Sequence, residues 1–322
     1  MRSKSLIAMA LIAWSATCGA QSYPSRPITL VVPAPPGGAT DTLARALAED
    51  LGKRLGQAII VDNKPGGAGA IAVQAITRGA PDGYTMLLSH SSPLINTPHL
   101  YRNVQYDVRR DLAFITELAV GKIVLAVNRD VPARTVQELF DWAAKNPGKV
   151  SYGSYGVGTF PHLVGTHLNQ ARGLDMVHVA YKGEAPMAQD MIAGNIAWVI
   201  GSVTTLGPFI KSGRVRALAV MGDKRIKEMP EVPTMAESGL KDQELRSPAW
   251  FGLFARSGTP AAILSRLEKE ARASVHSPTM RARFETLAVE PVGNSPAEFR
   301  REFDATEPVM ARMIRASGAT PE

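Results

Sequence analysis

The sequence predicts an α/β protein of two lobes, each a mostly parallel sheet flanked by helices. Short apolar, β-branched segments alternate with segments whose apolar residues recur every three or four positions, as in doubly wound sheets. The 322 residues are 45% hydrophobic, enough to fill two cores. Two strongly apolar strands, 123–127 and 215–220, can carry the chain between lobes and back. We therefore assign 22–122 plus 221–322 to lobe 1 and 123–220 to lobe 2.

The first strand, turn and helix form a well-defined local pattern. The β-branched run Thr29–Pro33 is followed by the bare turn PPGG and then by leucines at every fourth position from Leu43 to Leu55. That spacing predicts an amphipathic helix. We expect Thr40 or Asp41 to cap this helix, and Arg45, one turn further on, to pair with Asp41.

The same alternation continues to the end of the chain. In order, the patterns predict a strand at 58–61, a helix at 70–77, strands at 85–88 and 123–127, a helix at 136–145, strand–loop–helix units from 149 and from 177, a strand from 196, a strand at 215–220, and a largely helical tail from 260 with a break at 291–296.

Loops rich in glycine or serine follow four of these strands, at Gly37–Ala39, Gly66–Gly69, Ser89–Ser92 and Gly153–Thr159. In open α/β sheets, ligands bind at the carboxyl ends of strands, where helix N-termini present unpaired N–H groups. Glycine lets a ligand touch the backbone directly. Several such loops around one cleft predict a binding site for an anion that needs no arginine.

The N-terminus has the three-part form of a secretory signal peptide. The basic start MRSK is followed by an apolar run from Leu6 to about Thr17, which is shorter than the ~20 residues that span a bilayer. Cys18 and Ala20 precede a predicted cut before Gln21, so residues 1–20 are the signal peptide and the mature chain is periplasmic. The alternative is a lipoprotein modified on Cys18.

Composition excludes several classes of protein. The chain has one cysteine, which the predicted cleavage removes, so we expect neither disulfides nor thiol chemistry. The formal net charge of +7 is spread along the sequence without basic runs, and this argues against a nucleic-acid partner. A modest positive charge is compatible with anionic ligands.

No catalytic constellation or metal motif is visible. The six histidines form no H-E-x-x-H, and GSYG at 153–156 is not the G-x-S-x-G elbow of serine hydrolases. The GGAGAIA segment contains G-x-G-x-x-A, which resembles a dinucleotide-binding fingerprint, but the acidic residue expected about 20 positions later is missing. We therefore expect no metal, no cofactor and no enzymatic activity.

A resemblance to a known family rests on many segments in order. They are PAPPGGATDTLAR, VDNKPGGAGAIA, PDGYTMLL, HLYRNVQYDVRRDL, KNPGKVSYGSYGVGTFPHLVG, HVAYKGEAPMAQDMIAGNI, GRVRALAV, MPEVPTMAESGL and WFGLFARSGTP. From about Tyr23 onward the chain resembles the Bug family (UPF0065), the periplasmic substrate-binding proteins of tripartite tricarboxylate transporters.

This resemblance implies a two-lobed periplasmic-binding-protein fold with the ligand cleft between the lobes. It also implies a small carboxylate ligand, held largely by amides and hydroxyls, and a membrane transporter as partner. We expect the lobes to close on the ligand about the two crossover strands. Carried over by motif, the expected ligand residues are Gly37, Gly38, Ala39, Thr40, Ser89, His90, Ser91, Ser154, Gly158, Thr159, Tyr181, Lys182, Gly201 and Ser202.

One departure from the family bears on the ligand. Many members carry Asp where this chain has Gly201. Without that carboxylate, the sequence names no partner for a ligand ammonium. We therefore expect a mono- or dicarboxylate, aliphatic or aromatic, with no required amino group.

Two other functions stay open at this stage. One is an exported α/β hydrolase or transferase, which would need a nucleophile and a base that the motifs do not supply. The other is a receptor that acts mainly as a ligand sensor for a membrane signalling partner. It would differ from a transport receptor only in that partner.

We predict that export removes residues 1–20, because the charged start and short apolar run match a cleavable signal. Intact-mass analysis of a periplasmic extract should give a chain that begins at Gln21. A mass with diacylglycerol on Cys18 would contradict this cut and favour the lipoprotein.

Overall fold

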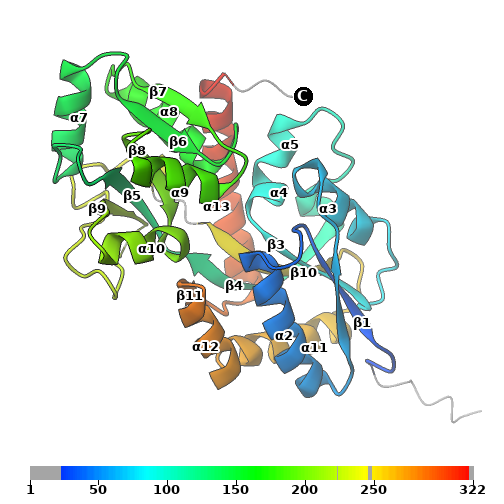
Figure 1. Ribbon diagram of the computed structural model, residues 1–322. Helices are drawn as coiled ribbons and strands as arrows, with labels where there is room; N and C mark the ends of the chain where they lie inside the picture. Colours follow the sequence, from blue (N-terminus) through cyan, green and yellow to red (C-terminus); the bar gives the residue numbers. More distant parts are fainter. Residues whose placement is uncertain (1–22, 223, 246–248, 319–322) are drawn as a thin grey trace, which may run out of the picture.

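Two sheets organise the computed structural model, which describes residues 23–222, 224–245 and 249–318 (Figure 1). Lobe 1 is built on a six-stranded sheet in the order β11-β4-β10-β3-β1-β2. Its strands are β1 Ile28–Val32, β2 Ile59–Asn63, β3 Thr85–His90, β4 Leu112–Gly121, β10 Trp250–Arg256 and β11 Val289–Pro291. Lobe 2 is built on a five-stranded sheet in the order β7-β6-β8-β5-β9. Its strands are β5 Ile123–Asn128, β6 Ser151–Ser154, β7 Val177–Ala180, β8 Trp198–Ser202 and β9 Val215–Met221.

Helices flank both sheets, which confirms the predicted α/β architecture (Figure 1). They are α2 Ala39–Leu55, α3 Ala70–Thr77, α4 Ser92–Ile95, α5 Thr97–Leu100, α6 Val108–Asp111, α7 Val136–Lys145, α8 Phe160–Ala171, α9 Glu184–Ala193, α10 Val203–Lys211, α11 Ala261–Val275, α12 Pro278–Thr286 and α13 Pro296–Ala316, with 3-10 turns η2 Gly67–Gly69 and η3 Gln243–Leu245. The predicted signal peptide lies outside the described residues.

Most strands of each sheet run in one direction, as predicted, and a minority are reversed. In lobe 1, β1 pairs in parallel with β2 and β3, but β10 is antiparallel to β3 and β4, and so is β11 to β4. In lobe 2, β6 pairs in parallel with β7 and β8, whereas β5 is antiparallel to β8 and β9. Only strands joined by a helical crossover run parallel. Strands β5 and β10 arrive from the other lobe instead, so both sheets are mixed.

A single residue separates the two sheets at the first crossing. Strand β4 ends at Gly121 and β5 begins at Ile123, with Lys122 between them. Every residue of β5 is buried, as the apolar pattern predicted. The Lys122 carbonyl accepts the N–H of Val203 at 2.8 Å, which ties the crossing to the start of α10.

The return to lobe 1 comes later than residue 221. After β9, Thr234 forms a bridge with Val220, and the side chains of Ile226, Met229 and Val232 belong to the lobe 2 core. Residues 224–240 therefore pack with lobe 2. The lobe limits stay our proposal, with the second crossing moved to the segment that precedes Trp250.

Helix α2 forms for the reason the sequence suggested. Leu43, Leu47 and Leu51 are fully buried, and Leu55 is almost so, which makes one apolar stripe against the lobe 1 sheet. The helix ends at Gly56, whose φ of 72° lets its N–H return to the Gly52 carbonyl at 2.9 Å.

Helix α13 belongs to both lobes. Near its start, Phe299 and Phe303 pack edge-on against Phe114 of β4, with ring centroids 5.1 and 5.4 Å apart. Near its end, Met313 and Ile314 lie in the same continuous core as residues of α8 in lobe 2. Figure 1 shows this helix running behind the gap between the sheets.

Close packing inside lobe 2 gives a stability prediction. A Cβ on Gly165 of α8 would lie 2.2 Å from the Tyr152 ring, which is itself stacked on Trp198 at 5.0 Å. We expect Gly165→Ala to lower the free energy of unfolding by roughly 1–3 kcal/mol through overpacking. The matched control is Gly207→Ala in α10, where the new Cβ would meet Val203 at an ordinary 3.5 Å. That change should be neutral or stabilise by about 0.5–1 kcal/mol, because helical alanine replaces glycine. Urea unfolding tests both, and a Gly165→Ala protein as stable as wild type would contradict the packing argument.

Candidate ligand-binding cleft

A cavity of about 730 Å³ lies between the lobes, and both lobes contribute to its walls. Lobe 1 supplies the start of α2, the end of β3 and the short helices α4 and α5. Lobe 2 supplies the loop after β6 and the starts of α9 and α10. The crossing residues Gly121, Lys122 and Ile123 also line it. The carboxyl ends of β3, β6 and β8 therefore meet around one space, as the loop pattern predicted.

The first loop is held by a buried carboxylate. The prediction that Thr40 or Asp41 caps α2 is wrong, because Gly38 occupies the N-cap position. Asp41 lies one turn inside and accepts the Gly37 N–H at 2.8 Å, the Arg45 Nε at 3.0 Å and the Asn63 Nδ2 at 2.9 Å. These hydrogen bonds hold the pKa of Asp41 below its usual value, although burial opposes them. The Gly37 N–H is therefore already used, while the predicted Arg45 pair is confirmed.

The third loop begins later than the sequence suggested, because β3 continues to His90. The hydroxyl of Ser89 is buried and donates to the His90 carbonyl at 2.8 Å, so it does not face the cavity. His90 lines the cavity, and its Nδ1 is enclosed without a hydrogen-bond partner among the described residues. Burial lowers the pKa of His90 to about 4, so the imidazole is neutral at pH 7.

The lobe 2 loop hides a serine–histidine pair that the motifs did not reveal. Ser154 Oγ lies 2.8 Å from His178 Nε2, and the ring of His178 lies 4.3 Å from that of His162. His162 Nδ1 in turn accepts the Gly158 N–H at 3.1 Å. Ser154 is fully buried and does not line the cavity. The pair therefore stabilises the loop from within lobe 2 and does not face the cavity.

Tyr181 and Lys182 of the YKG turn also lie outside the cavity lining. The Tyr181 hydroxyl donates to Asp190 Oδ2 at 2.8 Å, within the same lobe. The Lys182 side chain is exposed to solvent.

The side chain of Glu184 places a carboxylate beside Gly201. A Cβ on Gly201 would lie 3.0 Å from Glu184 Oε1. Glu184 accepts the Ser202 N–H, and its Oε2 accepts the Ser202 hydroxyl at 3.0 Å. The expectation that Gly201 leaves the cleft without an anion is therefore wrong, because a residue distant in sequence supplies the carboxylate. Glu184 lies in the segment YKGEAP, so the sequence shows its charge but not that its side chain points into the cleft.

Two contacts bridge the cleft in this conformation. Asn96 of lobe 1 donates from Nδ2 to the Gly158 carbonyl of lobe 2 at 3.2 Å. On the other side, the Thr204 hydroxyl of lobe 2 donates to the Leu287 carbonyl of lobe 1. A Cβ on Gly158 would lie 2.4 Å from Leu100, so glycine is needed for this approach.

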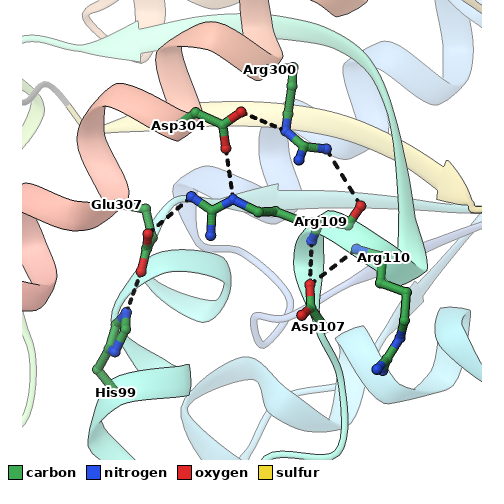
Figure 2. Close-up of polar contacts among 7 residues, drawn as sticks. All are labelled: His99, Asp107, Arg109, Arg110, Arg300, Asp304 and Glu307. Atoms are coloured by element: carbon green, nitrogen blue, oxygen red, sulfur yellow. Dashed lines mark hydrogen bonds and ion pairs between the residues drawn. The ribbon is translucent and has the colours of Figure 1, made fainter.

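Helix α13 forms part of the cavity wall through Thr306 and Met310. A charged cluster on its outer side fixes it to α5 and α6 (Figure 2). Arg109 reaches both Asp304 at 2.8 Å and Glu307 at 3.0 Å. The His99 ring lies 2.6 Å from the other oxygen of Glu307. The cluster joins residues almost 200 positions apart, and no local sequence pattern indicated it.

Of the fourteen predicted ligand residues, eight line the cavity: Ala39, Thr40, His90, Ser91, Gly158, Thr159, Gly201 and Ser202. The other six do not: Gly37, Gly38, Ser89, Ser154, Tyr181 and Lys182. Lining residues that the sequence did not indicate include Asn96, Lys122, Tyr155, Glu184, Trp250, Thr306 and Met310. Contact with a ligand stays a prediction for every one of these residues.

Among the described residues, no group of three or more His, Cys, Asp or Glu side chains is arranged to hold a metal ion. None of the helices in this part of the chain combines the length and apolarity that a bilayer span requires.

A family model for the tripartite tricarboxylate transporter family receptor matches residues 43–318. The chain belongs to this family. It is 36% identical over 299 residues to a UPF0065 protein from the tcbD-tcbE intergenic region of Pseudomonas sp. (strain P51), covering 92% of this chain and 88% of the relative. As a member of the receptor family, the chain is a solute-binding receptor.

Solved structures agree with the family and the fold. The periplasmic binding protein BugD is 32% identical with a TM-score of 0.76, covering 93% of this chain and all of that one. Rpa4515 of R. palustris, solved with adipate, is 30% identical with a TM-score of 0.79, at the same coverage. These neighbours are binding proteins, and the two-lobed fold expected from the resemblance is confirmed.

The adjacent rings of His162 and His178 predict a pH effect on stability. Burial, together with the neighbouring His162 ring, lowers the pKa of His178 to about 4 from 6.5. Between these values the unfolded chain binds a proton that the folded chain does not, so the stabilisation is lost as pH falls from about 6.5 to 4. As pH falls through this range, we expect the unfolding free energy of wild type to decrease more than that of His178→Asn. Asparagine keeps a polar partner for Ser154 but cannot titrate.

Urea unfolding of both proteins from pH 4 to 7.5 tests this. The difference between the two unfolding free energies cancels the contribution of groups that both proteins share. One such group is Glu117, whose pKa is raised by burial to about 7 and whose effect on stability has the opposite sign. A difference in unfolding free energy that is constant across this range would contradict the assigned shift.

Proposed function

We propose that this chain is an extracytoplasmic receptor that captures a small mono- or dicarboxylate between its lobes and delivers it to the membrane subunits of a tripartite tricarboxylate-type transporter. The observation that carries the proposal is the cavity enclosed by both lobes, with uncommitted hydrogen-bond donors on its lobe 1 wall. The likeness to a protein solved with adipate supports the same ligand class.

The lobe 1 wall is suited to an anion. Helix α2 begins at Ala39, so the N–H groups of Ala39 and Thr40 have no partner within the helix. No described residue accepts from the hydroxyls of Thr40, Ser91 or Ser92, and all three residues line the cavity. Hydrogen bonds to a charged group contribute ~1.5–3 kcal/mol each. A few of them offset the cost of burying a carboxylate.

Export, lobe closure and the absence of catalysis belong to the same proposal. Export is inferred from the signal-like N-terminus, and the closing motion from the single-residue crossing at Lys122. The Ser154–His178 pair is the one observation that favours a hydrolase. Ser154 is fully buried and lies outside the cavity lining, so it does not reach a substrate in this conformation. A sensor role would use the same cleft with another membrane partner.

We predict that purified protein, screened by thermal shift, will be stabilised by small carboxylic acids. A ligand at 100 times its dissociation constant should add ~2.7 kcal/mol to the unfolding free energy. Thr40→Val should weaken the best acid at least tenfold by calorimetry, because it removes a donor to a charged group.

Thr42→Val is the matched control, because Thr42 lies on the same helix but outside the cavity lining. Its affinity should equal that of wild type. Stabilisation by neutral sugars or polyamines, with every acid inert, would contradict the proposed function.

A further inference from the structure

The lobe 2 wall of the cavity carries a negative charge that the proposed carboxylate site does not use. Glu184 is the first residue of α9, and its carboxylate reaches the start of α10, the helix beside it (Figure 1). Ser202 supplies both of its hydrogen bonds, one from the backbone N–H and one from the hydroxyl. A carboxylate can accept about four hydrogen bonds, so acceptor capacity is left over.

No cation balances this charge. Within the described residues, no Lys, Arg or His lies within ion-pair distance of Glu184. The other charged group on the cavity wall is Lys122, whose Nζ lies 2.7 Å from Glu228 and 3.7 Å from Glu290. Lys122 is therefore already paired. A partly buried carboxylate without a counter-charge is costly, and a cationic group placed in the cavity would lower that cost.

The surroundings of Glu184 add a second uncommitted group. Tyr155 lines the cavity, and no described residue hydrogen-bonds its hydroxyl. Burial raises the pKa of Tyr155, and the charge of Glu184 raises it further, so the phenol stays protonated beside the carboxylate. The lobe 2 end of the cavity thus presents one anion, Glu184, with the uncommitted hydroxyl of Tyr155 near it.

The two ends of the cavity are therefore chemically opposite. Lobe 1 offers the helix N–H groups and hydroxyls of Thr40, Ser91 and Ser92, which suit a carboxylate. Lobe 2 offers Glu184, which repels a carboxylate and attracts a donor. A dicarboxylate spanning the cavity would place one of its charges against Glu184.

We propose that Glu184 binds a protonated amine of the ligand, so that the receptor selects an amino-bearing carboxylate whose acid group lies on lobe 1. This inference rests on the proposed function, because it takes the same cavity as the ligand site. It reverses the expectation, drawn from Gly201, that the ligand carries no required amino group.

A purely structural role for Glu184 makes a different prediction. A carboxylate at a helix N-terminus stabilises that helix, and Glu184 is placed to do this for α10 through Ser202. In that case its loss would weaken all ligands alike. The experiment must therefore compare ligands that differ only in the amine.

Calorimetry with matched pairs makes this comparison, using 4-aminobutyrate with butyrate, 5-aminopentanoate with pentanoate, and glutamate with glutarate. We expect wild type to bind at least one amino acid about tenfold or more tighter than its partner without the amine. Glu184→Gln should weaken that amino acid about 10- to 100-fold, as loss of a charge-assisted hydrogen bond implies. It should leave the partner unchanged or bound more tightly.

Glu231→Gln is the charge-matched control, because Glu231 is exposed and lies outside the cavity lining. It should leave every affinity unchanged. Thermal unfolding of the ligand-free variants checks that Glu184→Gln folds, and Glu184→Asp, which keeps the charge, should retain part of the amine preference.

Three results would overturn the inference. Equal weakening of both members of a pair by Glu184→Gln would assign Glu184 a structural role and leave the proposed function standing. If wild type bound the partner without the amine as tightly as or more tightly than the amino acid in all three pairs, Glu184 would not be an amine site, and the proposed carboxylate receptor would still stand. If neither the amino acids nor their partners without the amine bound, while a neutral sugar did, the proposed function and the inference would both be wrong.

Discussion

The geometry of the cleft depends on the crossing of the chain between the sheets at Lys122. Strand β4 of lobe 1 leads into strand β5 of lobe 2 with one residue between them, so the two sheets are directly connected at this point. The Lys122 carbonyl holds the start of α10, and its ammonium pairs with Glu228 of the segment that follows β9. Both bonds tie the crossing residue to lobe 2. The carboxyl ends of strands from both sheets open onto the same cavity.

Several polar groups near the cavity are committed to the loops that surround it. Asp41 holds the first loop through Gly37, and the Ser154–His178 pair holds the loop of lobe 2. Such internal bonds keep glycine-rich loops in one conformation. The groups left free differ between the lobes, with hydroxyls and helix N–H groups on lobe 1 and the Glu184 carboxylate on lobe 2.

Some elements followed directly from local pattern. The predicted helices at 70–77 and 136–145 have the observed bounds of α3 and α7. The leucine stripe of α2 is buried as expected. The strand β4 was missed, although it lies at the centre of lobe 1, because its pattern mixes Thr116 and Glu117 into an apolar run. Their polar groups are satisfied by Asn294, almost 180 positions away.

The sequence by itself determined the α/β class, the alternation of strands and helices, and the family, because periodicity and motifs are local properties. It also located the loops that meet in the cleft. Only the tertiary structure decided which groups in those loops are free. Ser154 and Ser89 turn away from the cavity, whereas Glu184 enters beside Gly201. Side-chain direction depends on partners that are distant along the chain, and no local pattern contains that information.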